Sequence, residues 1–247
     1  VARNADALER RRVLALEDGG EVLDRFAEDG GEAIRAYRAA KRTDDTSSTM
    51  VLDAAAVLLH PGGTATERTH QVIHVLDGHG VEQYGEVSIP AGAEVLTLRT
   101  HKPDGRTVEP ERAGGNKGTI SLAGLEPGDF VEVEYVRGTG GDGAGFAADP
   151  FFFRVTGSRL FRSTYVVAAP PGLGLELDAH GMEAPAVARE GDLDVVRAVA
   201  RDVPAHVPEP GSPPSTEFLP FLHAGVGGGP AALQRFLEEA AAGRARP

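Results

Sequence analysis

The sequence predicts a mainly β protein, an antiparallel β-sandwich of immunoglobulin-like type or larger, with short helical segments at both ends. Short apolar runs recur between residues 49 and 200, and most of them end at glycine or proline. No long helical periodicity separates these runs, which argues against the βαβ units of a parallel sheet. Glycine and proline number 32 and 17 of 247 residues, which suits a protein with many tight turns.

The chain divides into three parts. Residues 1–48 predict a helical lead-in and a polar connector, because Ala, Glu and Arg separate the apolar positions, and Ile34 and Tyr37 share one helix face. Residues 49–224 form the expected β-sandwich domain. Residues 225–247 predict a glycine hinge and then the start of a truncated C-terminal helical segment, since Pro230 suits a first helical position.

The order of apolar runs and turns predicts the individual strands. They are expected at 51–59, 65–76, 81–89, 95–102, 119–122, 130–136, 151–155, 160–169, 173–178, 194–200 and 218–222. Turn residues separate several of them, at 60–63, 77–78, 103–106 and 126–129. The run 65–76 is apolar on both faces, which is typical of a central strand. Five prolines in 203–214 predict an extended linker or edge segment.

The clearest alternation in the chain lies between residues 130 and 136. Val131, Val133 and Tyr135 point to one face and are expected to be buried. Glu132 and Glu134 point to the other face, which we expect to be wet. On this interpretation the substitution Glu132→Lys is nearly neutral, whereas Val133→Asp is costly.

Composition excludes several classes of function. The net charge of −12 disfavours nucleic acid and anionic lipid as partners. No apolar run approaches the ~20 residues of a spanning helix, so no membrane insertion is expected. The chain has no cysteine, which excludes disulfides, thiolate metal sites and a cysteine nucleophile. It begins at Val1 without a signal-peptide pattern, so we expect a removed leader or a segment of a longer protein.

Possible site motifs do not lead to a chemical assignment. The glycines of 138–143 match G-x-G-x-x-G but lack a following helix, so a mobile loop that binds no nucleotide is expected. His70 and His74 would lie roughly 13 Å apart on a strand, too far to share a metal, and are expected at the polar surface or rim. No G-x-S-x-G elbow occurs. We therefore predict no catalytic, cofactor-binding or metal residues, and no cofactor.

The phenylalanines 151–153 allow two interpretations. Three consecutive aromatic side chains cannot all face one core, so at least one points outward or against a neighbouring element. A strand covered on both sides explains them best, and an exposed contact patch is the alternative.

Several motifs occur in an order that resembles a known bacterial family. They lie at 51–53, 69–73, 85–90, 103–106, 122–129, 131–135, 161–167 and 208–211. Together they resemble the bacterial domain of unknown function 3857, the β-sandwich domain that precedes transglutaminase-like domains. The resemblance covers roughly residues 51–210. It implies a sandwich without catalytic residues of its own, next to a downstream domain that uses Cys, His and Asp.

The resemblance leads to a functional expectation. The chain is expected to be a non-catalytic structural or interaction module of a larger transglutaminase-like bacterial protein. It would position the downstream domain in cis or bind that domain's protein substrate, and an exported or periplasmic location would follow. The alternative is a carbohydrate- or peptide-binding sandwich with its own ligand, and a third possibility is an independent hydrolase. The lack of cysteine and of a recognisable triad counts against the hydrolase.

Overall fold

The computed structural model describes residues 19–61, 63–110, 119–139, 146–211, 213–214 and 217–226. Three expectations lie wholly or mainly outside these described residues. They are the helical start before residue 19, most of the glycine loop at 138–143, and the C-terminal helix from Pro230 onward.

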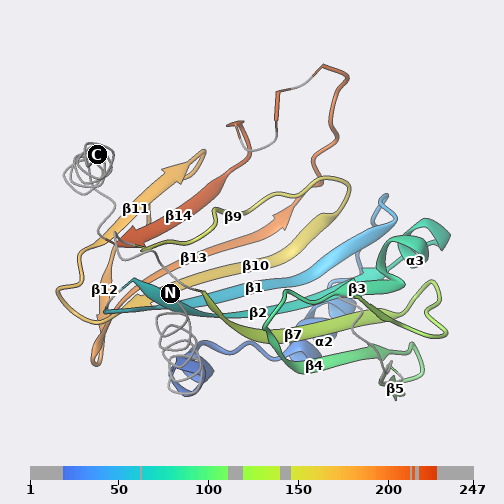
Figure 1. Ribbon diagram of the computed structural model, residues 1–247. Helices are drawn as coiled ribbons and strands as arrows, with labels where there is room; N and C mark the ends of the chain where they lie inside the picture. The colour runs from blue at the N-terminus through green and yellow to red at the C-terminus, as the bar shows by residue number, and fades with distance from the viewer. Residues whose placement is uncertain are drawn as a thin grey trace, which may run out of the picture.

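The described part is mainly β, as predicted, and is built on one large mixed sheet (Figure 1). The eight strands follow the order β12-β13-β10-β1-β2-β7-β4-β5. They are β1 (Ser48–His60), β2 (Thr64–Val75), β4 (Glu94–His101), β5 (Thr107–Val108), β7 (Phe130–Thr139), β10 (Arg159–Ala169), β12 (Ala188–Glu190) and β13 (Leu193–Val203). Strand β2 lies between β1 and β7, which confirms its predicted central place.

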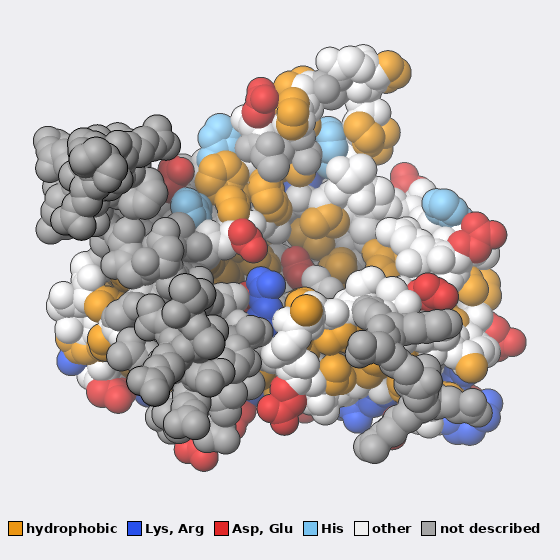
Figure 2. All heavy atoms as spheres, in the orientation of Figure 1, with side chains coloured by type: hydrophobic (Ala, Val, Ile, Leu, Met, Phe, Trp, Pro, Cys, Tyr) orange, Lys and Arg blue, Asp and Glu red, His pale blue; other side chains and the backbone are white. Residues whose placement is uncertain are grey.

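A small sheet covers part of one face of the large sheet (Figure 1). It contains β11 (Leu175–His180), β14 (Phe221–Val226) and β8 (Phe146–Ala147), and β9 (Phe151–Phe152) also pairs with β14. The core between the sheets includes Val57 and Tyr165 from the large sheet, and Leu222 and Ala224 from the small one. In the space-filling view, hydrophobic side chains gather in the hollow beneath the small sheet, whereas carboxylates are scattered over the face (Figure 2).

Short helical elements cover the opposite face of the large sheet. They are the 3-10 turn η1 (Asp24–Phe26) and the helix α2 (Gly30–Ala39). Asp29 caps α2, because its side chain accepts a 2.8 Å hydrogen bond from the amide of Glu32. Ile34 and Tyr37 are buried against β1 and β2, as their shared face predicted. None of the helices that the structure describes is long and apolar enough to cross a membrane.

One strand pair departs from the predicted antiparallel order. Strand β1 pairs with β10 in parallel, with Thr49 aligned to Arg159 and Leu58 to Ala168. The other named pairs are antiparallel within the described residues. The large sheet is therefore mixed, and the named pairs other than β1 and β10 follow the predicted antiparallel order. Alternation shows which face of a strand is buried, but it does not specify the neighbour or the direction of pairing.

The predicted strand at 81–89 is also wrong over most of its length. The helix α3 (Gly78–Tyr84) occupies this segment, and only the short strand β3 (Glu86–Ser88) follows, paired with β6 (Thr119–Ser121). Asp77 caps α3 by accepting a hydrogen bond from the amide of Gly80. A Cβ at Gly80 would lie 2.3 Å from the carbonyl oxygen of Ser47, so a glycine is needed at this contact. These contacts stabilise a helix in a segment whose apolar spacing predicted a strand.

The last predicted strand is displaced toward the C-terminus. It was expected at 218–222, but β14 covers Phe221–Val226. Gly225 pairs with Glu176 and with Ala147, so the hinge predicted from residue 225 is wrong for its first two residues. The remainder of that hinge lies outside the described residues.

The three phenylalanines of 151–153 pack on neighbouring side chains. Phe151 stacks on Tyr165 with 4.7 Å between the ring centroids, and Phe152 meets Phe221 edge to face at 5.7 Å. Phe153 is buried in the core between the sheets. The segment is therefore a contact between layers, and only its first two residues form a strand.

Candidate functional site

The two glutamates of β7 are buried, and their predicted exposure is wrong. Glu132 is 2% exposed and Glu134 is 8% exposed. Helix α2 and the segment before it cover this face of the sheet. Arg68 of β2 pairs with Glu134, and Arg99 of β4 pairs with Glu132. Val131 and Val133 are also buried, so β7 is covered on both faces.

Glu132 forms the centre of a buried ion cluster. His70 Nε2 lies 3.0 Å from its Oε1, while Arg99 Nε and His101 Nε2 lie 2.6 and 2.5 Å from its Oε2. Burial alone would raise the pKa of Glu132, but hydrogen bonds from His101, His70 and Arg99 outweigh burial and lower that pKa far below its usual value. Glu134 forms an ion pair with Arg68, whose Nη2 lies 2.7 Å from Glu134 Oε1.

His70 is buried, so its predicted place at the surface or rim is wrong. Its Nδ1 lies 3.1 Å from the carbonyl oxygen of Glu28, and its Nε2 faces Glu132. A Cβ at Gly30 would lie 2.2 Å from Glu132 Oε1, so only glycine lets α2 begin this close to the cluster. The cluster therefore fixes the start of α2 on the sheet, and its central carboxylate is sealed from solvent.

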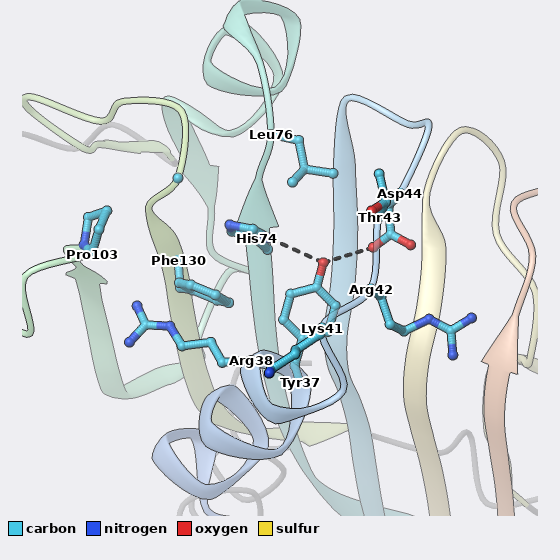
Figure 3. Close-up of a pocket in the computed structure, with 11 residues that line it drawn as sticks. Tyr37, Arg38, Lys41, Arg42, Thr43, Asp44, His74, Leu76, Pro103 and Phe130 are labelled. Carbon is cyan, nitrogen blue, oxygen red and sulfur yellow. Dashed lines mark hydrogen bonds between the residues drawn. The ribbon is translucent and has the colours of Figure 1, made fainter.

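A pocket of about 560 Å³ opens at the other end of α2, between the helix and the sheet (Figure 3). Its volume lies within the range of roughly 300–1,000 Å³ that is typical of small-ligand sites. The lining residues are Tyr37, Arg38, Lys41, Arg42, Thr43, Asp44, His74, Leu76, Pro103, Gly128 and Phe130. The pocket combines an aromatic floor, an apolar side and a cationic rim.

Three rings from three elements form the floor. His74 of β2 lies parallel to Phe130 of β7 with 4.2 Å between the centroids. The ring of Tyr37 of α2 lies edge on to both, with its centroid 5.4 Å from that of His74 and 6.1 Å from that of Phe130. This contact places His74 at a half-buried position on the pocket floor.

A buried carboxylate holds the tyrosine of the floor. The Tyr37 hydroxyl donates a 2.7 Å hydrogen bond to Asp44 and lies 3.2 Å from His74 Nδ1 (Figure 3). Thr49 donates a second hydrogen bond to Asp44, at 2.6 Å. Burial and the bond to Asp44 raise the pKa of Tyr37 to about 12, so the phenol stays neutral and fixed.

The rim carries three cations from the end of α2 and the turn that follows. Arg42 pairs with Asp202, and in Figure 3 it points away from the side where Arg38 lies. Arg38 lies over the ring of Phe130, 4.9 Å from its centroid. Within the described residues, neither Arg38 nor Lys41 forms an ion pair. Lys41 has a φ of 47°, the left-handed conformation in which many helices end, and its amide donates a 3.2 Å hydrogen bond to the carbonyl oxygen of Arg38.

The cations of this arrangement could hold an anion at the pocket. Arg38 and Lys41 supply positive charge in a chain whose net charge is −12. In the described part of the chain, no group of three or more His, Asp or Glu side chains could hold a metal ion. The pocket was not predicted from the sequence, although three cations within residues 38–42 of an acidic chain were a signal that could have revealed it.

Lowering the pH below about 6.5 should destabilise the fold, in part through His74. Burial, and next the charge of Arg38, lower the pKa of folded His74 below the ordinary 6.5, and they outweigh Asp44 and Asp129. Below that value the unfolded chain binds the proton more readily, so stability is lost as the pH falls. In urea denaturation across this pH range, the free energy of unfolding of the His74→Gln variant should depend less on pH than that of the unmodified protein.

The matched control is His79→Gln, because the His79 side chain is 75% exposed on α3. This variant should keep the pH dependence of the unmodified protein. The same slope in all three proteins would show that His74 does not contribute.

The fold and the pocket define a mainly β module built on a mixed eight-stranded sheet, with a basic pocket beneath α2. No protein-family model matches the chain, and no curated protein matches it significantly in sequence. A solved structure of a "putative protease" from Parabacteroides distasonis ATCC 8503 is similar, with a TM-score of 0.65 and 19% identity. The match covers 78% of this chain and 43% of that one, and at this identity it shows a shared fold.

More distant matches come from an M1 zinc metallopeptidase of Deinococcus radiodurans. One of its structures has a TM-score of 0.39 and 11% identity, and the match covers 73% of this chain and 42% of that one. Its E323A mutant bound to a Tyr-Ser-Ala substrate has a TM-score of 0.38 and 12% identity.

Proposed function

We propose that this chain is a non-catalytic recognition module of a larger transglutaminase-like bacterial protein. It binds the protein substrate of the downstream catalytic domain and thereby positions that substrate in cis. The ordered motifs between residues 51 and 210 support this context. The chain has no cysteine, which supports the assignment of the catalytic thiolate to another domain of the larger protein.

We further propose that the module is a β-sandwich larger than an immunoglobulin-like domain. The shared core between the eight-stranded sheet and the small sheet supports this assignment. The parallel pair of β1 and β10 and the length of the large sheet favour the larger type over the immunoglobulin-like one.

The basic pocket is the observation that carries the proposed function. Arg38 and Lys41 face a half-enclosed space with an aromatic floor, and the rest of the acidic surface would repel an anionic chain. A neutral sugar would gain little from two cations, so the pocket favours a peptide over a carbohydrate. An anionic segment of a protein would be held at the pocket and kept away from the remaining surface.

Fluorescence anisotropy with labelled peptides tests this function. Anionic peptides should bind the chain, while cationic peptides of equal length should not. The double variant Arg38→Glu, Lys41→Glu should weaken anionic peptide binding at least tenfold, because repulsion replaces attraction. Higher salt should weaken the binding as well.

The matched control is Arg35→Glu, because Arg35 is exposed on the same helix but does not line the pocket. This variant should bind as the unmodified chain does. An equal loss in the control, or no binding of anionic peptides at all, would reject the proposal. Turnover of peptide or acyl-transfer substrates by the chain alone would reject its non-catalytic part.

A further inference from the structure

We propose that the pocket beneath α2 binds the free C-terminal carboxylate of a polypeptide whose last side chain is apolar. This inference rests on the proposed function and specifies its ligand. It follows from three properties of the pocket: the number of available cations, the position of the buried carboxylate, and the apolar wall.

The available charge fits a single carboxylate. Arg42 is engaged by Asp202, which leaves Arg38 and Lys41 as the cations of the pocket without an ion pair among the described residues. Arg38 already uses the face of its guanidinium on the ring of Phe130. Its N–H edges remain available, and such a planar edge matches the two oxygens of a carboxylate.

The buried carboxylate of Asp44 disfavours a more highly charged ligand. Its side chain is 2% exposed, and it lines the same pocket. Asp44 Oδ1 lies 3.8 Å from Arg159 Nε, which offsets part of its negative charge, and the remainder opposes a second negative charge nearby. A phosphate monoester brings nearly two charges at neutral pH, so it would be repelled more strongly than a carboxylate.

The remaining wall suits an apolar side chain at a chain end. Leu76 and Pro103 also line the pocket, with Pro103 on the side of Phe130 and Leu76 above His74 in the view (Figure 3). The inner end is closed by Tyr37 and His74, whose polar groups already bond to one another and to Asp44.

Paired synthetic peptides test the inference by fluorescence anisotropy. The first has a Gly-Ser spacer, a C-terminal phenylalanine and a free carboxylate, and the second is the same peptide with a C-terminal amide. We expect the free acid to bind at least tenfold more tightly than the amide. Arg38→Gln and Lys41→Gln should each remove most of this preference, while Arg35→Gln should preserve it. Thermal melts check that each variant is folded.

Two further peptides, both amidated at the C-terminus, identify the source of the anion. One carries internal glutamates and the other a phosphoserine. If the glutamate peptide binds as tightly as the free acid, the C-terminal specificity is wrong but the proposed function stands. If the phosphoserine peptide binds most tightly, the preference for a carboxylate is wrong. If neither the free acid nor the glutamate peptide binds, the proposed function fails as well.

Discussion

Replacing Glu132 by lysine should lower the free energy of unfolding by about 3–5 kcal/mol, the range expected when a buried ion pair loses one partner. The lysine would place an ammonium group among His70, Arg99 and His101, which now converge on the carboxylate. The side chain of Glu132 is 3% exposed, so water could not solvate the added charge. Chemical denaturation followed by circular dichroism measures the loss.

Glu94→Lys is the matched control, because Glu94 is an exposed residue of the neighbouring strand β4. A surface charge reversal of this kind should change stability by no more than about 0.5 kcal/mol. Equal stability of the Glu132→Lys and Glu94→Lys variants would contradict the buried cluster. It would support the earlier prediction that one face of β7 is exposed to solvent.

Val133→Asp should destabilise the protein by several kcal/mol, through the opposite face of the same strand. Val133 is 4% exposed and pairs with Gln71 of β2 and Leu98 of β4. Neither neighbour can neutralise a carboxylate, so the aspartate would be buried without a charge partner. Thermal melting and chemical denaturation should both show the loss.

The control for this substitution is Val199→Asp. Val199 also lies in a strand of the large sheet, but it is 47% exposed. The change there should be small, since the new carboxylate remains in water. A comparable loss at both positions would show that strand propensity, and not burial, determines the effect.

Strand β7 shows what the sequence can predict and what it cannot. Alternation correctly assigned Val133 and Glu132 to opposite faces, since that follows from backbone geometry. It could not show that α2 covers the second face, because that contact joins residues far apart in the sequence. The hydrogen-bond partners that make burial of Glu132 tolerable come from β2 and β4, and their register with β7 is not encoded locally.

The pocket was harder to predict than the sheet for the same reason. Its lining comes from the end of α2, the end of β2, a turn before β5 and the start of β7. The local turn signals at 103–106 and 126–129 were correct, and Gly105 and Gly128 both adopt positive φ. Turns depend on a few neighbouring residues and can therefore be predicted from the sequence, whereas the pocket forms only when the whole fold brings four segments together.

The parallel contact between β1 and β10 also has a consequence for how the protein reaches its native state. Thr49 aligns with Arg159, so β2, β4 and β7 are synthesised before the second neighbour of β1 exists. Pairings this distant in sequence form slowly, because a long loop must close before the contact gains energy. Until then β1 presents an open, largely apolar edge, and translation paused before residue 159 would leave a nascent chain prone to aggregation.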